Sequence, residues 1–129
     1  GLWGVSGLAV YRAHFQFDNV HPFIYGAFGF LLVSRTPLFS SASPRVYRAI
    51  LLSLTVAGLS DLAENAAHIY LLGQAQGFRS VIIPVSATCS LFKWVLASLF
   101  AVLVAIRFAR ELWAGASRRR NGAQGRAGR

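Results

Sequence analysis

The chain has 129 residues, of which 55% are hydrophobic and only 13% charged, and its mean hydropathy is +0.51. A soluble domain carries about a quarter charged residues, so this composition argues against one. The net charge of +9 largely describes a tail, because seven of the thirteen Lys and Arg residues lie from Arg107 onward, and we expect no nucleic-acid partner.

Residues 1–10 are apolar but too short to span a membrane, and we expect residues 1–19 to form an outward-facing N-terminal segment. The first predicted span runs from about Val20 to Ser34. It begins at His21-Pro22, where a proline suits the first turn of a helix. A Ser- and Pro-rich loop follows this span.

Two longer apolar segments complete the predicted fold. They run from about Val46 to Leu72 and from about Val81 to Ile106, beyond the roughly 20 residues that cross a hydrocarbon core of about 30 Å. The sequence therefore predicts an all-α, multi-span transmembrane bundle over residues 20–113. Residues 114–129 are rich in Gly and Arg, which is typical of a disordered tail.

The basic residues predict an orientation. Arg35, Arg45 and Arg48 flank the first loop, and with the seven of the C-terminal region they make ten on one side, against Arg12 and Arg79 on the other. Such asymmetry marks the cytoplasmic side, which predicts a membrane protein with a cytoplasmic C-terminus. The chain begins at Gly1 and has no Met, so we also expect a fourth span upstream.

The second span carries four polar residues on one helical stripe, at spacings of three, four and seven: Asp61, Glu64, Asn65 and His68. A charge at the centre of a membrane helix costs about 2.5–3.5 kcal/mol, so the stripe should face protein, water or a ligand. Lys93 lies at nearly the same depth in the third span, about 20 Å from its cytoplasmic end. The sequence predicts a buried network of Asp61, Glu64, Asn65 and Lys93.

Small residues predict where helices approach closely. Ala97, Ala101 and Ala105 follow Lys93 at intervals of four, and Gly26 and Gly29 lie in the first span. Such positions allow helix backbones to pack in a membrane.

A second polar cluster is predicted at the outer edge, from His14, Asp18, His21 and His68. With Glu64 these side chains would suit Zn or non-haem Fe. Without a metal, His14 and His21 would be interfacial polar residues, and His68 would hydrogen-bond to Glu64 or Asp18. The sequence requires no cofactor.

Three stretches together resemble a family of small uncharacterised bacterial membrane proteins with four predicted spans. They are Asp18 to Gly26, Asp61 to Asn65, and Thr88 followed by Lys93-Trp94. The resemblance implies an upstream span and no particular activity. The positions it carries over are Asp18, Pro22, Tyr25, Asp61, Glu64, Asn65 and Lys93; His21 departs from it, since the family has Phe before the proline.

Three functions follow as hypotheses. In the first, the chain is a non-catalytic subunit of a membrane complex, in contact with lipid and other membrane proteins, and the network fixes helix packing. In the second, it is a proton-coupled transporter or ion-translocating protein that uses Glu64 or Asp61. In the third, it is a metal-dependent membrane enzyme that uses the outer cluster on a lipid or quinone-like substrate.

Overall fold

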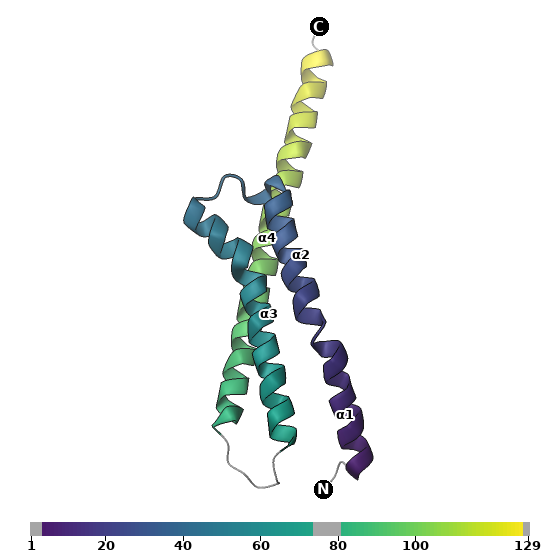
Figure 1. The fold of residues 1–129 in the computed structure, drawn as a ribbon. Coiled ribbons are helices and arrows are strands. Elements are labelled where there is room, and N and C mark those ends of the chain that lie inside the picture. The colour runs from purple at the N-terminus through teal and green to yellow at the C-terminus, as the bar shows by residue number, and fades with distance from the viewer. Residues whose placement is uncertain (1–3, 74–80, 128–129) are drawn as a thin grey trace.

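The computed structural model describes residues 4–73 and 81–127, which form helices and contain no strand (Figure 1). This confirms the all-α prediction. In chain order the elements are α1 (Gly4–Asp18), α2 (His21–Arg35), the short 3-10 helix η1 (Pro37–Phe39), α3 (Pro44–Leu72) and α4 (Ile82–Ala127).

Helix α3 is the centre of the fold. Both α2 and α4 pack extensively against it and run antiparallel to it, whereas α2 and α4 have at most marginal contact with each other (Figure 1). The two outer helices are therefore held together through α3, and the space between them is left open.

Two of the described helices are long and apolar enough to cross a membrane: α3, with 29 residues, and α4 over residues Ile82–Ser117. Helix α2 has 15 residues, which extend about 22 Å and fall short of a hydrocarbon core of about 30 Å. A third span, and a fourth one upstream, stay predictions.

Residues Gly4–Asp18 form a helix, α1, separated from α2 by Asn19 and Val20. Pro22 accounts for the break, because it has no N–H to donate to the carbonyl of Asp18 and its ring would clash with that carbonyl. Helix α1 also contacts α3. The polar residues on both sides of the break thus lie beside the stripe on α3.

Glycines bring α2 close to α3. Gly26 and Gly29, the predicted packing positions, are buried at this interface. A Cβ on Gly29 would lie 2.7 Å from Cδ1 of Leu54, and one on Gly58 would lie 2.9 Å from the Pro22 carbonyl oxygen. The separation of the two helices therefore depends on the absence of side chains at these positions.

The apolar core lies toward the end of the molecule where η1 connects α2 to α3. Its buried residues come from α2, η1, α3 and α4: Val33, Phe39, Ile50, Leu54, Ala57 and Phe100. Arg107 of α4 lies over this end, with its guanidinium carbon 5.8 Å from the ring centroid of Phe39 and its Nη1 donating to Ser41 Oγ at 3.2 Å.

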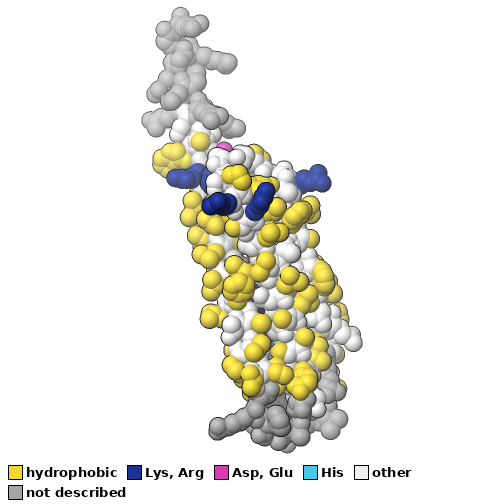
Figure 2. All heavy atoms as spheres, turned by 60° about the vertical axis from the view of Figure 1, so that its left-hand side comes forward, with side chains coloured by type: hydrophobic (Ala, Val, Ile, Leu, Met, Phe, Trp, Pro, Cys, Tyr) yellow, Lys and Arg dark blue, Asp and Glu magenta, His cyan; other side chains and the backbone are white. Residues whose placement is uncertain are grey.

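Apolar side chains dominate the surface, and Lys and Arg side chains gather at one end of the face shown in Figure 2. Arg35, Arg45 and Arg48 are all exposed near the α2–α3 connection. Helix α4 extends past this end and continues to Ala127, where the sequence predicts a disordered tail from residue 114. This stretch contains no proline and includes the strong helix formers Ala, Arg and Gln, which accounts for the continued helix.

Candidate polar site between three helices

Lys93 joins the two carboxylates of the α3 stripe. Its Nζ lies 2.8 Å from Asp61 Oδ1 and 2.7 Å from Glu64 Oε2. The three side chains retain 17%, 14% and 13% of their exposure, respectively, so they are only partly buried. The predicted partners are therefore present, but the prediction of a buried pair is wrong, because α2 and α4 do not close over it.

Tyr25 connects the same site to α2. Its hydroxyl donates to Asp61 Oδ2 at 3.0 Å, so the two oxygens of Asp61 hold α2 and α4 separately. Tyr25 was a predicted position only through the family resemblance, and its bond to Asp61 was not predicted. One signal was available in the sequence, since a tyrosine hydroxyl inside a protein usually finds a partner.

Asn65, the most buried of the four predicted network residues, does not bind Lys93. It is 6% exposed, and its Nδ2 donates to Asn19 Oδ1 at 3.1 Å. This bond fastens α3 to the break between α1 and α2. Asn65 thus belongs to a second polar contact, beside the Lys93 network and not within it.

The predicted outer cluster divides into separate contacts. His14 Nε2 lies 3.0 Å from Asp18 Oδ2 within α1, and His68 Nε2 lies 3.0 Å from Ser86 Oγ of α4. The expected partners of His68, Glu64 or Asp18, are therefore replaced by Ser86. His68 also packs against the ring of Phe15. Within residues 4–73 and 81–127, no group of three or more His, Cys, Asp or Glu side chains could hold a metal ion.

These polar residues nonetheless share one cavity. A chamber of about 510 Å³ is lined by His14, Phe15, Asp18, His21, Tyr25, Asp61, Glu64, Asn65, His68 and Lys93. It brings both predicted clusters together, with His21 exposed on its wall. Among the described residues, every buried side-chain nitrogen and oxygen has a hydrogen-bond partner.

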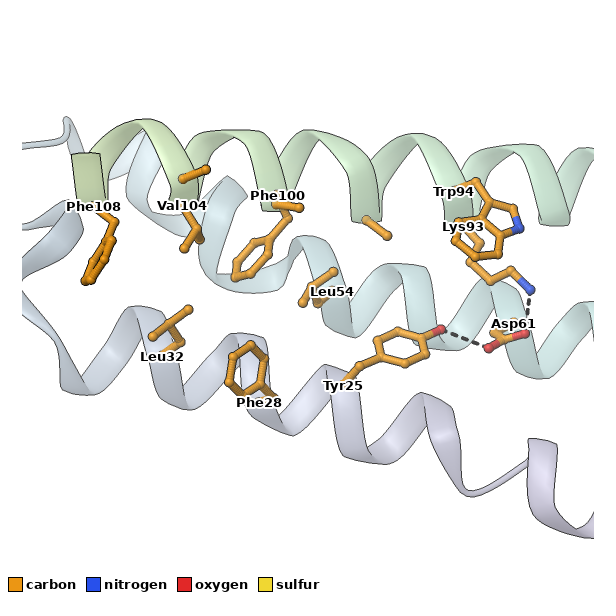
Figure 3. Close-up of a pocket in the computed structure, with 13 residues that line it drawn as sticks. Tyr25, Phe28, Leu32, Leu54, Asp61, Lys93, Trp94, Phe100, Val104 and Phe108 are labelled. Carbon is orange, nitrogen blue, oxygen red and sulfur yellow. Dashed lines mark hydrogen bonds and ion pairs between the residues drawn. The ribbon is translucent and has the colours of Figure 1, made fainter. Parts of the chain in front are cut away.

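A second, apolar cavity shares the lining residues Tyr25, Asp61 and Lys93 with the chamber. It is a groove of about 630 Å³ between α2 and α4, with α3 as its floor (Figure 3). Its lining residues are Tyr25, Phe28, Leu32, Leu54, Asp61, Lys93, Trp94, Ala97, Phe100, Ala101, Val104, Ala105 and Phe108. The groove is thus polar at one end and apolar along the rest.

The alanines predicted to pack against a helix line this groove. Ala97 is partly buried against the core, whereas Ala101 and Ala105 are exposed. Trp94 stands at the polar end of the groove and is 64% exposed, with Lys93 Nζ 5.8 Å from its ring centroid. No described helix covers the alanines, and their predicted role against another helix stays a prediction.

These features define a class: an all-α protein that has two helices of membrane-spanning length and a polar centre that joins three helices. Comparisons with models of protein families, with curated proteins and with solved structures found no match for this chain. The site itself therefore has to carry the functional argument.

Proposed function

We propose that the chain is a multi-pass protein of a bacterial inner membrane, with the α2–α3 connection and the C-terminal end of α4 on the cytoplasmic side. The two membrane-length helices support this proposal, as do the arginines gathered at one end of the molecule (Figure 2). Such clustering of basic residues is typical of the cytoplasmic side. In this arrangement α1 and α2 cross together as one broken span.

Within the membrane, we propose that the chain acts as a non-catalytic subunit or interaction partner whose polar network fixes the arrangement of its helices. The observation that carries this proposal is the position of Asp61, which accepts from Tyr25 of α2 and from Lys93 of α4. An unpaired charge in a membrane helix costs about 2.5–3.5 kcal/mol, so the pairing favours one register of the three helices over others.

The outer face of α4 is the surface that we propose for a partner. Large apolar side chains on this face are exposed, among them Leu99, Val102, Leu103 and Ile106. Helices associate in lipid through close packing, which requires a fixed surface. The network would supply that surface by holding α4 in one rotation against α3.

Site-specific photo-crosslinking in intact cells tests this proposal. A photoreactive residue at Leu103 should give a discrete adduct with another membrane protein or a second copy, and Lys93→Met should abolish that adduct. Lys93→Met combined with Asp61→Asn should restore part of it. A protein that gives no adduct from any exposed position of α4, and that migrates as an isolated monomer after gentle solubilisation, would contradict the proposal.

The other two hypotheses have separate tests. Transport through Glu64 predicts that Glu64→Gln changes pH-dependent flux in liposomes. Metal-dependent catalysis predicts stoichiometric metal in the purified protein.

A further inference from the structure

We propose that the polar chamber and the α2–α4 groove together bind one single-chain amphiphile with a cationic amine head group. The head would occupy the chamber, and the alkyl chain would lie in the groove. This inference goes beyond a role in assembly, because it assigns a small-molecule ligand to the chain.

The two cavities meet at the ion-pair site. Tyr25, Asp61 and Lys93 line both of them, so the polar and apolar spaces lie on the two sides of this hydrogen-bonded set, and a ligand that fills both has to pass over these side chains. Figure 3 shows these three residues at one end of the groove, with Phe100, Val104 and Phe108 further along α4. A ligand that fills both spaces has to be polar at one end and apolar along the rest.

The dimensions of the groove suit an alkyl chain. Lys93 and Phe108 are 15 residues apart on α4, which corresponds to about 22 Å. An extended alkyl chain is long and narrow, so a groove of this length can hold one. The groove volume of about 630 Å³ also lies within the roughly 300–1,000 Å³ of small-molecule sites.

The charges in the chamber favour a cationic head. Asp18, Asp61 and Glu64 supply three carboxylates, against the one ammonium of Lys93, so the chamber carries an excess of two negative charges when its histidines are neutral. Protonation of His14, which is paired with Asp18, would lower this excess by one. The Lys93 ammonium already binds two carboxylates, so an anionic head would have to displace one of them.

The direction of the site agrees with the proposed orientation. The chamber lies on the outer side of Lys93, and the groove runs from Lys93 toward the cytoplasmic end of α4. An amphiphile of the outer leaflet has its head outward and its chain pointing to the bilayer centre. Such an amphiphile already points in the direction of the site, but it would have to move deeper into the bilayer for its chain to occupy the groove between Lys93 and Phe108.

Trp94 provides a reporter inside the groove. Trp3→Phe and Trp113→Phe leave Trp94 as the single tryptophan, and the protein is reconstituted into phosphatidylcholine vesicles. The probes are a long-chain alkylamine with bromine on its chain and the matching brominated alkyl sulfate. We expect saturable quenching of Trp94 fluorescence by the amine, and only weak, linear quenching by the sulfate.

One substitution in the groove and one in the chamber test the two parts of the site separately. Ala101→Phe fills the groove and should weaken amine binding about tenfold or more, whereas Val95→Phe, at an exposed position of α4 that lines neither cavity, should leave it unchanged. Asp18→Asn removes a carboxylate outside the Lys93 network and should weaken amine binding about three- to tenfold. Ala105→Phe is a second groove variant, to be used if Ala101→Phe does not fold.

Three outcomes would overturn the inference. The first is equal saturable quenching by amine and sulfate, which would show that the chamber does not select a cation. The second is unchanged amine binding in a folded groove variant. The third is a protein adduct from a photoreactive residue at Ala101, which would assign the groove to a partner helix. An adduct from Leu103 without saturable amine quenching would contradict the amphiphile site alone and leave the assembly role supported.

Discussion

The hydroxyl of Tyr25 lies 3.0 Å from the carboxylate of Asp61, although the two residues are 36 positions apart in the chain. The other carboxylate oxygen of Asp61 accepts from Lys93. Each oxygen therefore attaches a different helix to α3, and Asp61 is the residue on which both attachments depend.

The ion pairs predict a pattern of recovery. Lys93→Met leaves Asp61 and Glu64 as facing, unpaired carboxylates, and we expect it to lower the free energy of unfolding by about 2–4 kcal/mol. Adding Asp61→Asn should recover part of the loss, and adding Glu64→Gln to both should recover more. Thermal unfolding in mild detergent, followed by helical circular dichroism, measures each variant. Purely additive effects would show that these residues are not coupled.

The bond from Tyr25 predicts a smaller effect. Tyr25→Phe keeps the ring but leaves Asp61 with one donor fewer, and we expect a loss of about 1–2 kcal/mol. Tyr70→Phe is the matched control, because Tyr70 lies exposed near the end of α3, and it should change the unfolding temperature little. Equal effects of the two substitutions would mean that the Tyr25 hydroxyl contributes nothing to the attachment of α2.

The surroundings of the glycines predict how strongly each Gly→Ala substitution changes the stability of the protein. Gly58→Ala would push Cβ against the backbone oxygen of Pro22, which can yield only if α2 moves, so we expect destabilisation of about 1–3 kcal/mol. The Cβ that Gly29→Ala adds would lie 2.8 Å from Cβ of the buried Leu54, an atom that cannot rotate away, and the substitution should be destabilising to a similar degree. Gly115→Ala meets nothing within 4 Å and should stabilise α4 by up to about 1 kcal/mol. Thermal unfolding checks the order; a stable Gly58→Ala variant would show that α2 and α3 are not in close contact there.

The orientation predicts labelling from opposite sides. In a Cys89→Ser background, Gly73→Cys lies at the proposed outer end of α3 and Ser43→Cys at its cytoplasmic end, both at exposed positions. A membrane-impermeant maleimide should label Gly73→Cys in intact spheroplasts and Ser43→Cys only after lysis. The reverse pattern would place the C-terminal end outside the cell.

The sequence predicts the contacts of Lys93 with Asp61 and Glu64, because these contacts depend mainly on the depth of each residue along its helix. Residue counts along two helices place Asp61 and Lys93 at the same level, and the periodicity of α3 places Glu64 on the same stripe. The bond between His68 and Ser86 depends in addition on how α3 and α4 are rotated about their axes. Residue spacing within one helix does not specify how that helix is rotated against its neighbour, so this bond could not be predicted.

Burial was also beyond the sequence, for a related reason. The stripe on α3 predicts that its charges face protein, water or a ligand, and Asp61 and Glu64 do contact Lys93, but their exposure depends on how closely the two outer helices approach. These helices have at most marginal contact, so the chamber and the groove stay open. The predicted outer cluster placed His14 and Asp18 near Glu64, but the sequence did not predict that they share one cavity with Asp61 and Lys93.

In the proposed membrane arrangement, the pairing of α3 with Lys93 also sets the order in which α3 and α4 can insert stably. Helix α3 is the less apolar of the two long helices and carries Asp61 and Glu64, each of which costs about 2.5–3.5 kcal/mol in lipid by itself. Helix α4 is more apolar and carries only Lys93 at this level, so the translocon can release it alone. In the proposed membrane arrangement we therefore expect stable insertion of α3 to await the synthesis of α4, and we expect a ribosome stalled before Lys93 to leave α3 free to return from the bilayer.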